Sequence, residues 1–283
     1  MSFYYPSPGP HNKYKNFNCN SSLCRLQQLA TPSTVTVVLV SLLLVTPAVI
    51  FWLWLMILPA KWATECPEEC RCDTHSYPAY MVNCSGSSLN SIPSMVPKHL
   101  HILVFDGNKI TYFENDNFVS IGLVELLVIQ ADFSKIRKLE LGAFKGLTNL
   151  TNLSIQGNEI SEIIARTSQN CSHMKDIDLR NMRIEQLERD IFCGLLKLEY
   201  INMEGNNLRY IHPVVFSGLP ILESLHLSKI CGFQTRTDRH FINSHSLTSL
   251  FASYCNVSSV SVETFAKVSA LEWLHLSYNN LRR

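Results

Sequence analysis

Apolar and polar positions follow one recurring pattern from about residue 100 to the end of the chain. In the segment LEYINMEGNNL, residues 198–208, apolar side chains stand at Leu198, Ile201, Met203 and Leu208. The alternation around Ile201 has a period of two, which predicts a short strand with one buried face. The pattern occurs eight times, beginning at Leu100, Leu123, Leu150, Met174, Leu198, Leu222, Leu247 and Leu271.

Successive segments begin 23 to 27 residues apart. A period of ~20–29 residues with the pattern L-x-x-L-x-L-x-x-N-x-L is typical of leucine-rich repeats, and residues 66–283 resemble the extracellular leucine-rich-repeat family. The resemblance implies an α/β fold, a horseshoe-shaped solenoid of about eight coils over residues 100–283, with a parallel sheet on its concave face. Because one coil cannot bury its own apolar face, the coils must stack.

The asparagine of the pattern lies where the strand turns toward the core and leaves backbone groups without strand partners. A buried unpaired group costs ~1–3 kcal/mol, and a carboxamide both donates and accepts hydrogen bonds. We therefore expect stacked asparagines to link neighbouring coils at Asn108, Asn158, Asn206 and Asn279. Weaker links are expected in the other four segments, where the position holds Ala131, Met182, Ile230 and Cys255.

Four cysteines precede the first segment, in CPEECRCDTHSYPAYMVNC. Their spacing resembles the cysteine-rich N-terminal cap of secreted and cell-surface leucine-rich-repeat proteins, so residues 66–99 are expected to cover the apolar edge of the first coil. Four cysteines allow three pairings, and the resemblance implies Cys66 with Cys72 and Cys70 with Cys84. A zinc site is the alternative for these thiols, although metal-type histidine spacing is lacking nearby.

The other cysteines of the repeat region are less distinctive. Cys171 takes the place of a core leucine and is expected to be a buried small side chain. Cys193 is expected on the convex surface. Cys231 and Cys255 stand at adjacent positions of successive coils, where a disulfide is one alternative.

The region before the cap has two parts. Residues 1–34 are polar, and we expect them to be disordered. Residues 35–58 carry no charge over 24 positions, which is enough for a helix to span a bilayer core of ~30 Å. We interpret 35–58 as a signal-anchor transmembrane helix with a cytoplasmic N-terminus, and a cleaved signal peptide is the alternative. In both cases the residues after 60 are exported.

Glycosylation sequons agree with export. The motif N-x-S/T occurs in the repeat region at Asn83, Asn149, Asn152, Asn170 and Asn256. Asn152 falls on an expected strand of the concave face, so a glycan there would screen the middle coils.

Charge and motifs exclude other classes of function. The chain has 24 basic and 23 acidic residues, whereas a nucleic-acid partner normally requires a basic patch. A nucleophile elbow, a phosphate-binding loop and a metal-binding motif are all missing from the sequence. We therefore expect no enzyme activity, no cofactor and no metal.

Side chains between the leucines of each strand should point out of the concave face, where this family usually binds its ligands. The early coils are mixed: Val104, Leu127 and Ile129 are apolar there, whereas Asp176, Asp178 and Arg180 are charged. Aromatic side chains gather in the later coils, and exposed aromatics on a rigid sheet are typical interface anchors. The alternative is that these aromatics occur there by chance. The candidate residues are Tyr200, His226, Phe251, Tyr254, Trp273, His275 and Tyr278.

These features together predict a non-catalytic ectodomain of a cell-surface receptor or adhesion protein, which binds a protein ligand and is held to the membrane by residues 35–58. A secreted extracellular-matrix repeat protein is the alternative. The sequence gives no indication of oligomeric state. The chain ends in LSYNNLRR, two residues past the last leucine of the pattern, so the eighth coil is expected to be incomplete.

Overall fold

The computed structural model describes residues 66–73, 80–165, 171–230 and 242–282. All of them belong to one compact unit, residues 65–283. The segments 1–34 and 35–58, and with them the expected membrane anchor, lie outside the described residues. Within the described ranges, no helix is both long and apolar enough to cross a bilayer.

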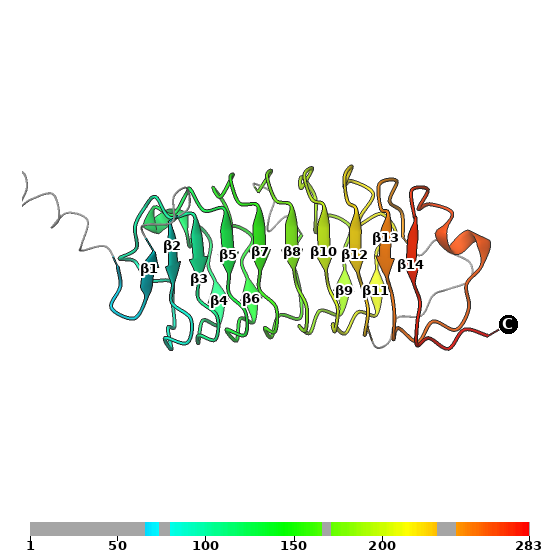
Figure 1. Cartoon of the computed structure of the whole chain (residues 1–283), viewed down its shortest axis with the longest axis horizontal. Helices are drawn as coiled ribbons and strands as arrows, with labels where there is room; N and C mark the ends of the chain where they lie inside the picture. The colour runs from blue at the N-terminus through cyan, green and yellow to red at the C-terminus, as the bar shows by residue number, and fades with distance from the viewer. Residues whose placement is uncertain (1–65, 74–79, 166–170, 231–241, 283) are drawn as a thin grey trace, which may run out of the picture. The chain divides into compact units, whose positions relative to one another are not determined.

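Ten short strands lie side by side in one sheet and follow the order of the chain (Figure 1). The first two strands pair antiparallel, and every later pair of neighbours is parallel and in register. The last eight strands therefore bound seven turns of a solenoid. The ten strands are β1 (Arg71–Asp73), β2 (Met81–Asn83), β3 (Ile102–Val104), β5 (Val128–Gln130), β7 (Asn152–Ser154), β8 (Asp176–Asp178), β10 (Tyr200–Asn202), β12 (Ser224–His226), β13 (Ser249–Phe251) and β14 (Trp273–His275).

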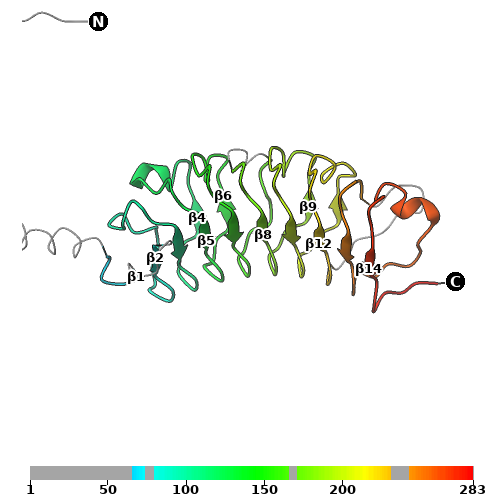
Figure 2. The ribbon, with the colours of Figure 1, turned by 45° about the horizontal axis from the view of Figure 1, so that its top comes forward.

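The return segments form a second, less regular layer, seen on the far side of the coils from the main sheet in Figure 2. Two pairs of two-residue parallel strands lie there: β4 (Tyr112–Phe113) with β6 (Lys138–Leu139), and β9 (Gln186–Leu187) with β11 (Tyr210–Ile211). Two 3₁₀ helices complete the layer, η1 (Val119–Ile121) and η2 (Val262–Phe265).

The expected α/β class needs a correction, because the described residues contain no α-helix. The helical turns stop after three or four residues; η1, for example, ends at Gly122, whose φ of 84° is left-handed and cannot continue a helix. The fold is a β-solenoid with irregular returns. The remaining features of a leucine-rich-repeat solenoid, the parallel sheet and the stacked coils, are present.

The core runs along the interior of the solenoid. The middle residue of each strand points into it, from Leu103 in β3 to Leu250 in β13, and both of these are fully buried. Phenylalanines from the return segments pack against them from the opposite side; Phe113 meets Phe118 and Phe144 edge to face at ring distances of 5.5 and 6.0 Å. Each coil thus completes the core of its neighbours, as stacking requires.

The second segment begins three residues later than its pattern suggests. Ile129 pairs with Leu103 in the sheet and is fully buried, so this segment starts at Leu126 and not at Leu123. Both leucines are buried, and both fit the leading position. Two expectations were therefore wrong. Ile129 belongs to the core and not to the exposed sheet face, and the asparagine position of this coil is held by Ser134 and not by Ala131.

The asparagines bind the coil that precedes their own. Asn158, which is 3% exposed, donates to the carbonyl oxygens of Ala131 and Ile155 at 2.8 and 2.6 Å. Its side-chain oxygen accepts from the backbone N–H groups of Ser134 and Ile136 at 3.0 and 2.9 Å. One carboxamide thus pairs four backbone groups at a buried turn, which a hydrocarbon side chain cannot do.

Two other residue types replace part of this bonding. Ser134 is fully buried, and its hydroxyl donates to the carbonyl oxygen of Phe105 in the preceding coil at 3.0 Å. Cys255 points its thiol at the equivalent carbonyl, that of Leu227, with Sγ and oxygen 3.0 Å apart. Met182 and Ile230 are buried at the same position and have no comparable donor.

The residue directly before each of these positions adopts a left-handed backbone in all eight coils. Glycine, which tolerates this conformation best, supplies three of them. Gly157 also lies under the ring of Phe133 from the preceding coil, so that a Cβ atom there would collide with it. The eight residues are Gly107, Phe133, Gly157, Asn181, Gly205, Lys229, Tyr254 and Tyr278.

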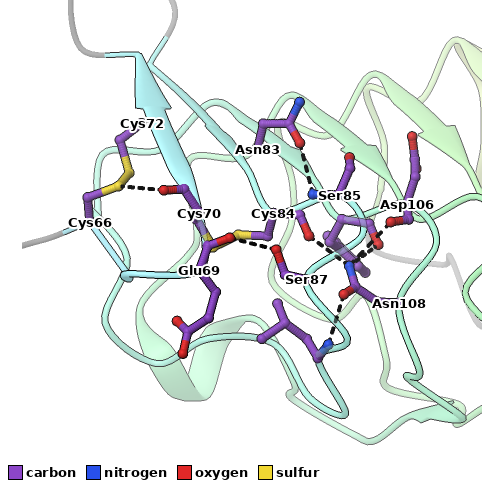
Figure 3. Close-up of a disulfide and its surroundings, with 12 residues drawn as sticks. Cys66, Glu69, Cys70, Cys72, Asn83, Cys84, Ser85, Ser87, Asp106 and Asn108 are labelled. Carbon is purple, nitrogen blue, oxygen red and sulfur yellow. Dashed lines mark hydrogen bonds between the residues drawn. A yellow bond between two sulfur atoms is a disulfide. The ribbon is translucent and has the colours of Figure 1, made fainter.

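The cap reproduces the bonding of a coil at the N-terminal end (Figure 3). Disulfides join Cys66 to Cys72 and Cys70 to Cys84, which leaves no thiolate for the alternative zinc site. Strand β2 pairs with β3, and Asn108 binds the cap as the other asparagines bind a coil, donating to the carbonyl oxygen of Cys84 at 2.9 Å. The cap therefore covers the apolar edge of the first coil.

The remaining cysteines differ in their surroundings. Cys171 is fully buried, and burial raises the pKa of its thiol to about 12, so it stays protonated and unreactive at neutral pH. Cys193 is exposed, in the return segment between β9 and β10. Cys231 lies outside the described residues, so the alternative of a bridge to Cys255 stays a hypothesis.

Candidate ligand-binding face

The solvent-facing side of the ten-stranded sheet, here called the sheet face, is built from the residues on either side of each buried strand centre. In β10 to β14 these residues form two rows. The first row is Tyr200, Ser224, Ser249 and Trp273, and the second is Asn202, His226, Phe251 and His275.

The rings of the second row are stacked. The ring centroids of His226 and Phe251 lie 4.1 Å apart with an angle of 13° between the planes, and those of Phe251 and His275 lie 4.4 Å apart at 7°. Tyr200, from the first row, contacts the end of the stack: its ring lies 5.0 Å from that of His226 and is tilted by 51° against it. Because each ring restrains the next, the surface is already ordered before a ligand arrives, which lowers the entropy lost on binding.

Polar contacts orient the stack at its β10 end. Asn202, which is nearly buried, donates to the hydroxyl oxygen of Tyr200 at 2.9 Å. The Ser224 hydroxyl lies 3.1 Å from Nε2 of His226. Burial lowers the pKa of His226; the charge of Glu204 opposes this shift, and the charge of Arg180 adds to it. The imidazole is therefore neutral at pH 7 and stacks as an uncharged ring.

Two tyrosines extend the aromatic surface beyond the strands. Tyr254 and Tyr278 stack with centroids 4.4 Å apart and an angle of 8°. They are 49% and 74% exposed, and both hold the left-handed position that recurs in every coil, with φ of 57°.

Trp273 is the most exposed ring on the strands themselves, at 63%. Part of that exposure comes from its place on β14, which has one neighbouring strand among the described residues. The same edge leaves Leu274 39% exposed, whereas Leu250 in β13 is fully buried. All seven sequence-predicted candidates thus lie on β10 to β14 and the turns that follow these strands.

The sheet face changes character over β5, β7 and β8. A shallow hollow of about 370 Å³ lies there, lined by apolar strand residues and by polar side chains including Gln130, Ser154 and Asp178. Asn152 donates to Asp176 across it, and burial raises the pKa of the Asp176 carboxyl. Arg180 forms a forked ion pair with Asp178, 2.6 Å at its shortest. In this half, Asp178 is thus ion-paired, whereas Asp176 is held by a neutral hydrogen-bond donor.

The sequons occupy different surroundings. Asn149 and Asn256 are exposed, whereas Asn83 and Asn152 are half-buried. Asn170 lies outside the described residues. Glycosylation at these five positions stays a prediction, and Asn152 is the one that would place a glycan in the hollow.

The sequence pattern did not identify all the residues that shape the sheet face. The small side chains of Ser224 and Ser249 leave the surface between Tyr200 and Trp273 lower than the rings on either side. Asn202 positions the ring of Tyr200. Small and amide side chains carry no distinctive signal, although their strand positions follow from the repeat. Within the described ranges, no group of three His, Cys, Asp or Glu side chains is placed to hold a metal ion.

Comparisons with known proteins agree with this architecture. A leucine-rich-repeat family profile matches residues 172–229. Bovine (Bos taurus) lumican is 29% identical over 77% of the chain, and the match spans 60% of lumican. Toll-like receptor 3 of Boselaphus tragocamelus is 26% identical over 70% of the chain but over only 24% of its own length.

A solved structure supports the fold in the same way. Human 5T4, also titled Wnt-activated inhibitory factor 1 or trophoblast glycoprotein, superposes with a TM-score of 0.65 at 19% identity, covering 77% of this chain and 82% of that one. These relatives are structural or binding proteins and not enzymes. The described residues have the fold of a leucine-rich-repeat solenoid, with a disulfide-bonded cap at its N-terminal end.

Proposed function

We propose that this chain is a secreted, non-catalytic protein of the extracellular matrix that binds a protein ligand on the sheet face of β10 to β14. The observation that supports the binding site is the stack of His226, Phe251 and His275, with Tyr200 in contact at one end and with Trp273 and the tyrosine pair beside it. Preordered, exposed aromatics are the side chains that most often dominate binding energy at protein interfaces.

The proposal of a secreted form rests on the relatives. The similarity extends over most of lumican, a matrix proteoglycan, but over only about a quarter of the Toll-like receptor. A membrane-anchored receptor or adhesion protein is the second candidate, favoured by the uncharged segment 35–58. N-terminal sequencing of the mature protein separates the two. A first residue beyond 58 is expected for the secreted form, and an intact N-terminus would establish the anchored one.

The binding site can be tested by a comparison of variants. A panel of secreted and cell-surface proteins is first screened with the full chain, and the affinity of each bound protein is then measured for Trp273→Ala and Phe251→Ala. Truncation of an aromatic anchor costs ~2 kcal/mol or more, so we expect each variant to bind at least about 30-fold more weakly.

Tyr112→Ala is the matched control for these variants. Tyr112 is 54% exposed on β4, in the return layer on the other side of the coils, and its loss is expected to leave affinity unchanged. Unaltered binding by both the Trp273 and Phe251 variants would rule out the proposed site.

A further inference from the structure

Glutamates border the aromatic rows on the side where the strands begin. The residues directly before β10, β12, β13 and β14 are Glu199, Glu223, Thr248 and Glu272. Backbone hydrogen bonds of 2.8–3.0 Å run from each of them to the one before, so they form a third row beside the first. Three of the four positions in this row are acidic.

The available cations leave part of this charge unpaired. Glu199 pairs with Lys175 at 2.9 Å, and Glu204, at the other end of β10, pairs with Lys229 at 2.8 Å. Glu223 and Glu272 are exposed and have no ion-pair partner among the residues that the structure describes. From one residue before each strand to three residues after it, β10 to β14 carry four glutamates against one lysine.

The first aromatic row has a shape that suits a long side chain. Ser224 and Ser249 lie next to each other between Tyr200 and Trp273. With adjacent strands ~4.8 Å apart, the two aromatic positions are separated by about 14 Å. Small side chains there let a ligand side chain approach the sheet, with a ring on either side and Glu223 directly before Ser224.

We propose that the sheet face of β10 to β14 binds a basic segment of its protein partner, with an arginine or lysine side chain over Ser224 and Ser249. A guanidinium or ammonium group gains cation–π contact from Tyr or Trp and a charge-assisted hydrogen bond from a carboxylate. An acidic segment would meet unpaired carboxylates and be repelled. This inference rests on the proposed function and adds the chemistry of the partner.

The test uses two 16-residue peptides, one alternating arginine with serine and one alternating glutamate with serine. Binding to the full chain is measured by fluorescence anisotropy at low and at high salt. We expect the basic peptide to bind and the acidic peptide not to bind. The double variant Glu223→Gln/Glu272→Gln is expected to bind the basic peptide about five- to tenfold more weakly at low salt, and the difference should shrink as salt screens the charges.

Glu185→Gln/Glu188→Gln is the matched control, because it removes the same charge from exposed positions around β9 in the return layer. It is expected to leave affinity unchanged. Equal weakening by the two double variants would show that net charge alone attracts the peptide, and binding of the acidic peptide would likewise overturn the inference.

The same variants separate this inference from the function on which it rests. Suppose that the screened protein ligands lose affinity for Trp273→Ala but not for Glu223→Gln/Glu272→Gln. The aromatic site would then stand and the basic partner would be wrong. If the ligands bind the aromatic variants with unchanged affinity as well, both the aromatic site and the basic partner would be wrong.

Discussion

Replacing Asn206 with alanine is expected to destabilise the solenoid by about 2–4 kcal/mol. Asn206 is 1% exposed and lies in the middle of the stack. It donates to the carbonyl oxygens of Leu179 and Met203 at 2.7 and 2.8 Å and accepts from the N–H group of Ile184 at 3.2 Å. Alanine would leave these buried groups without their partner, and each such group costs ~1–3 kcal/mol, partly recovered by relaxation or by water.

Asn207→Ala provides the control within the same turn. Asn207 is exposed, so its loss is expected to change stability by no more than about 0.5 kcal/mol. Urea unfolding of the full chain, followed by circular dichroism, compares the two variants with the parent protein. A repeat array can unfold in more than one step, so the comparison uses the transition of the repeat region. Similar midpoints for both variants would contradict the assigned role of Asn206.

The solenoid could be predicted from the sequence because its core is periodic. Stacking requires a leucine or isoleucine at the same positions of every coil. The pattern stays recognisable where single positions differ, as at Met174. The register of the second segment could not be decided in this way, because Leu123 and Leu126 are both buried and both fit the leading position. Ser134 indicates the correct register, because a buried hydroxyl can partly substitute for the asparagine carboxamide.

The residues of the sheet face could also be predicted from the sequence, but their arrangement could not. Strand alternation identified the side chains of β10 to β14 that face solvent, because the period of two leaves no choice once the centre is buried. It could not show that His226, Phe251 and His275 stack, since stacking depends on rotamers and on register across three strands. Nor could it show that Tyr254 and Tyr278 hold left-handed positions, because the pattern alone would place glycine or asparagine there.

Loss of the Cys70–Cys84 disulfide is expected to lower the stability of the unit by about 3 kcal/mol or more. The bond spans 14 residues, and closing a loop of that length removes ~3 kcal/mol of entropy from the unfolded chain in the loop-closure description. Cys84 is also fully buried, directly after β2 in the cap. A loosened cap would expose the apolar edge of the first coil to water.

The pair Cys66–Cys72 gives a matched comparison for this disulfide. It spans only six residues, and neither of its cysteines is fully buried. Thermal unfolding under non-reducing conditions should therefore show a larger fall in Tm for Cys70→Ala/Cys84→Ala than for Cys66→Ala/Cys72→Ala. The 14-residue bond is expected to matter more because it holds β2, the strand on which the first coil is stacked, to the start of the cap. An equal or smaller fall for Cys70→Ala/Cys84→Ala would contradict the larger role assigned to this bond.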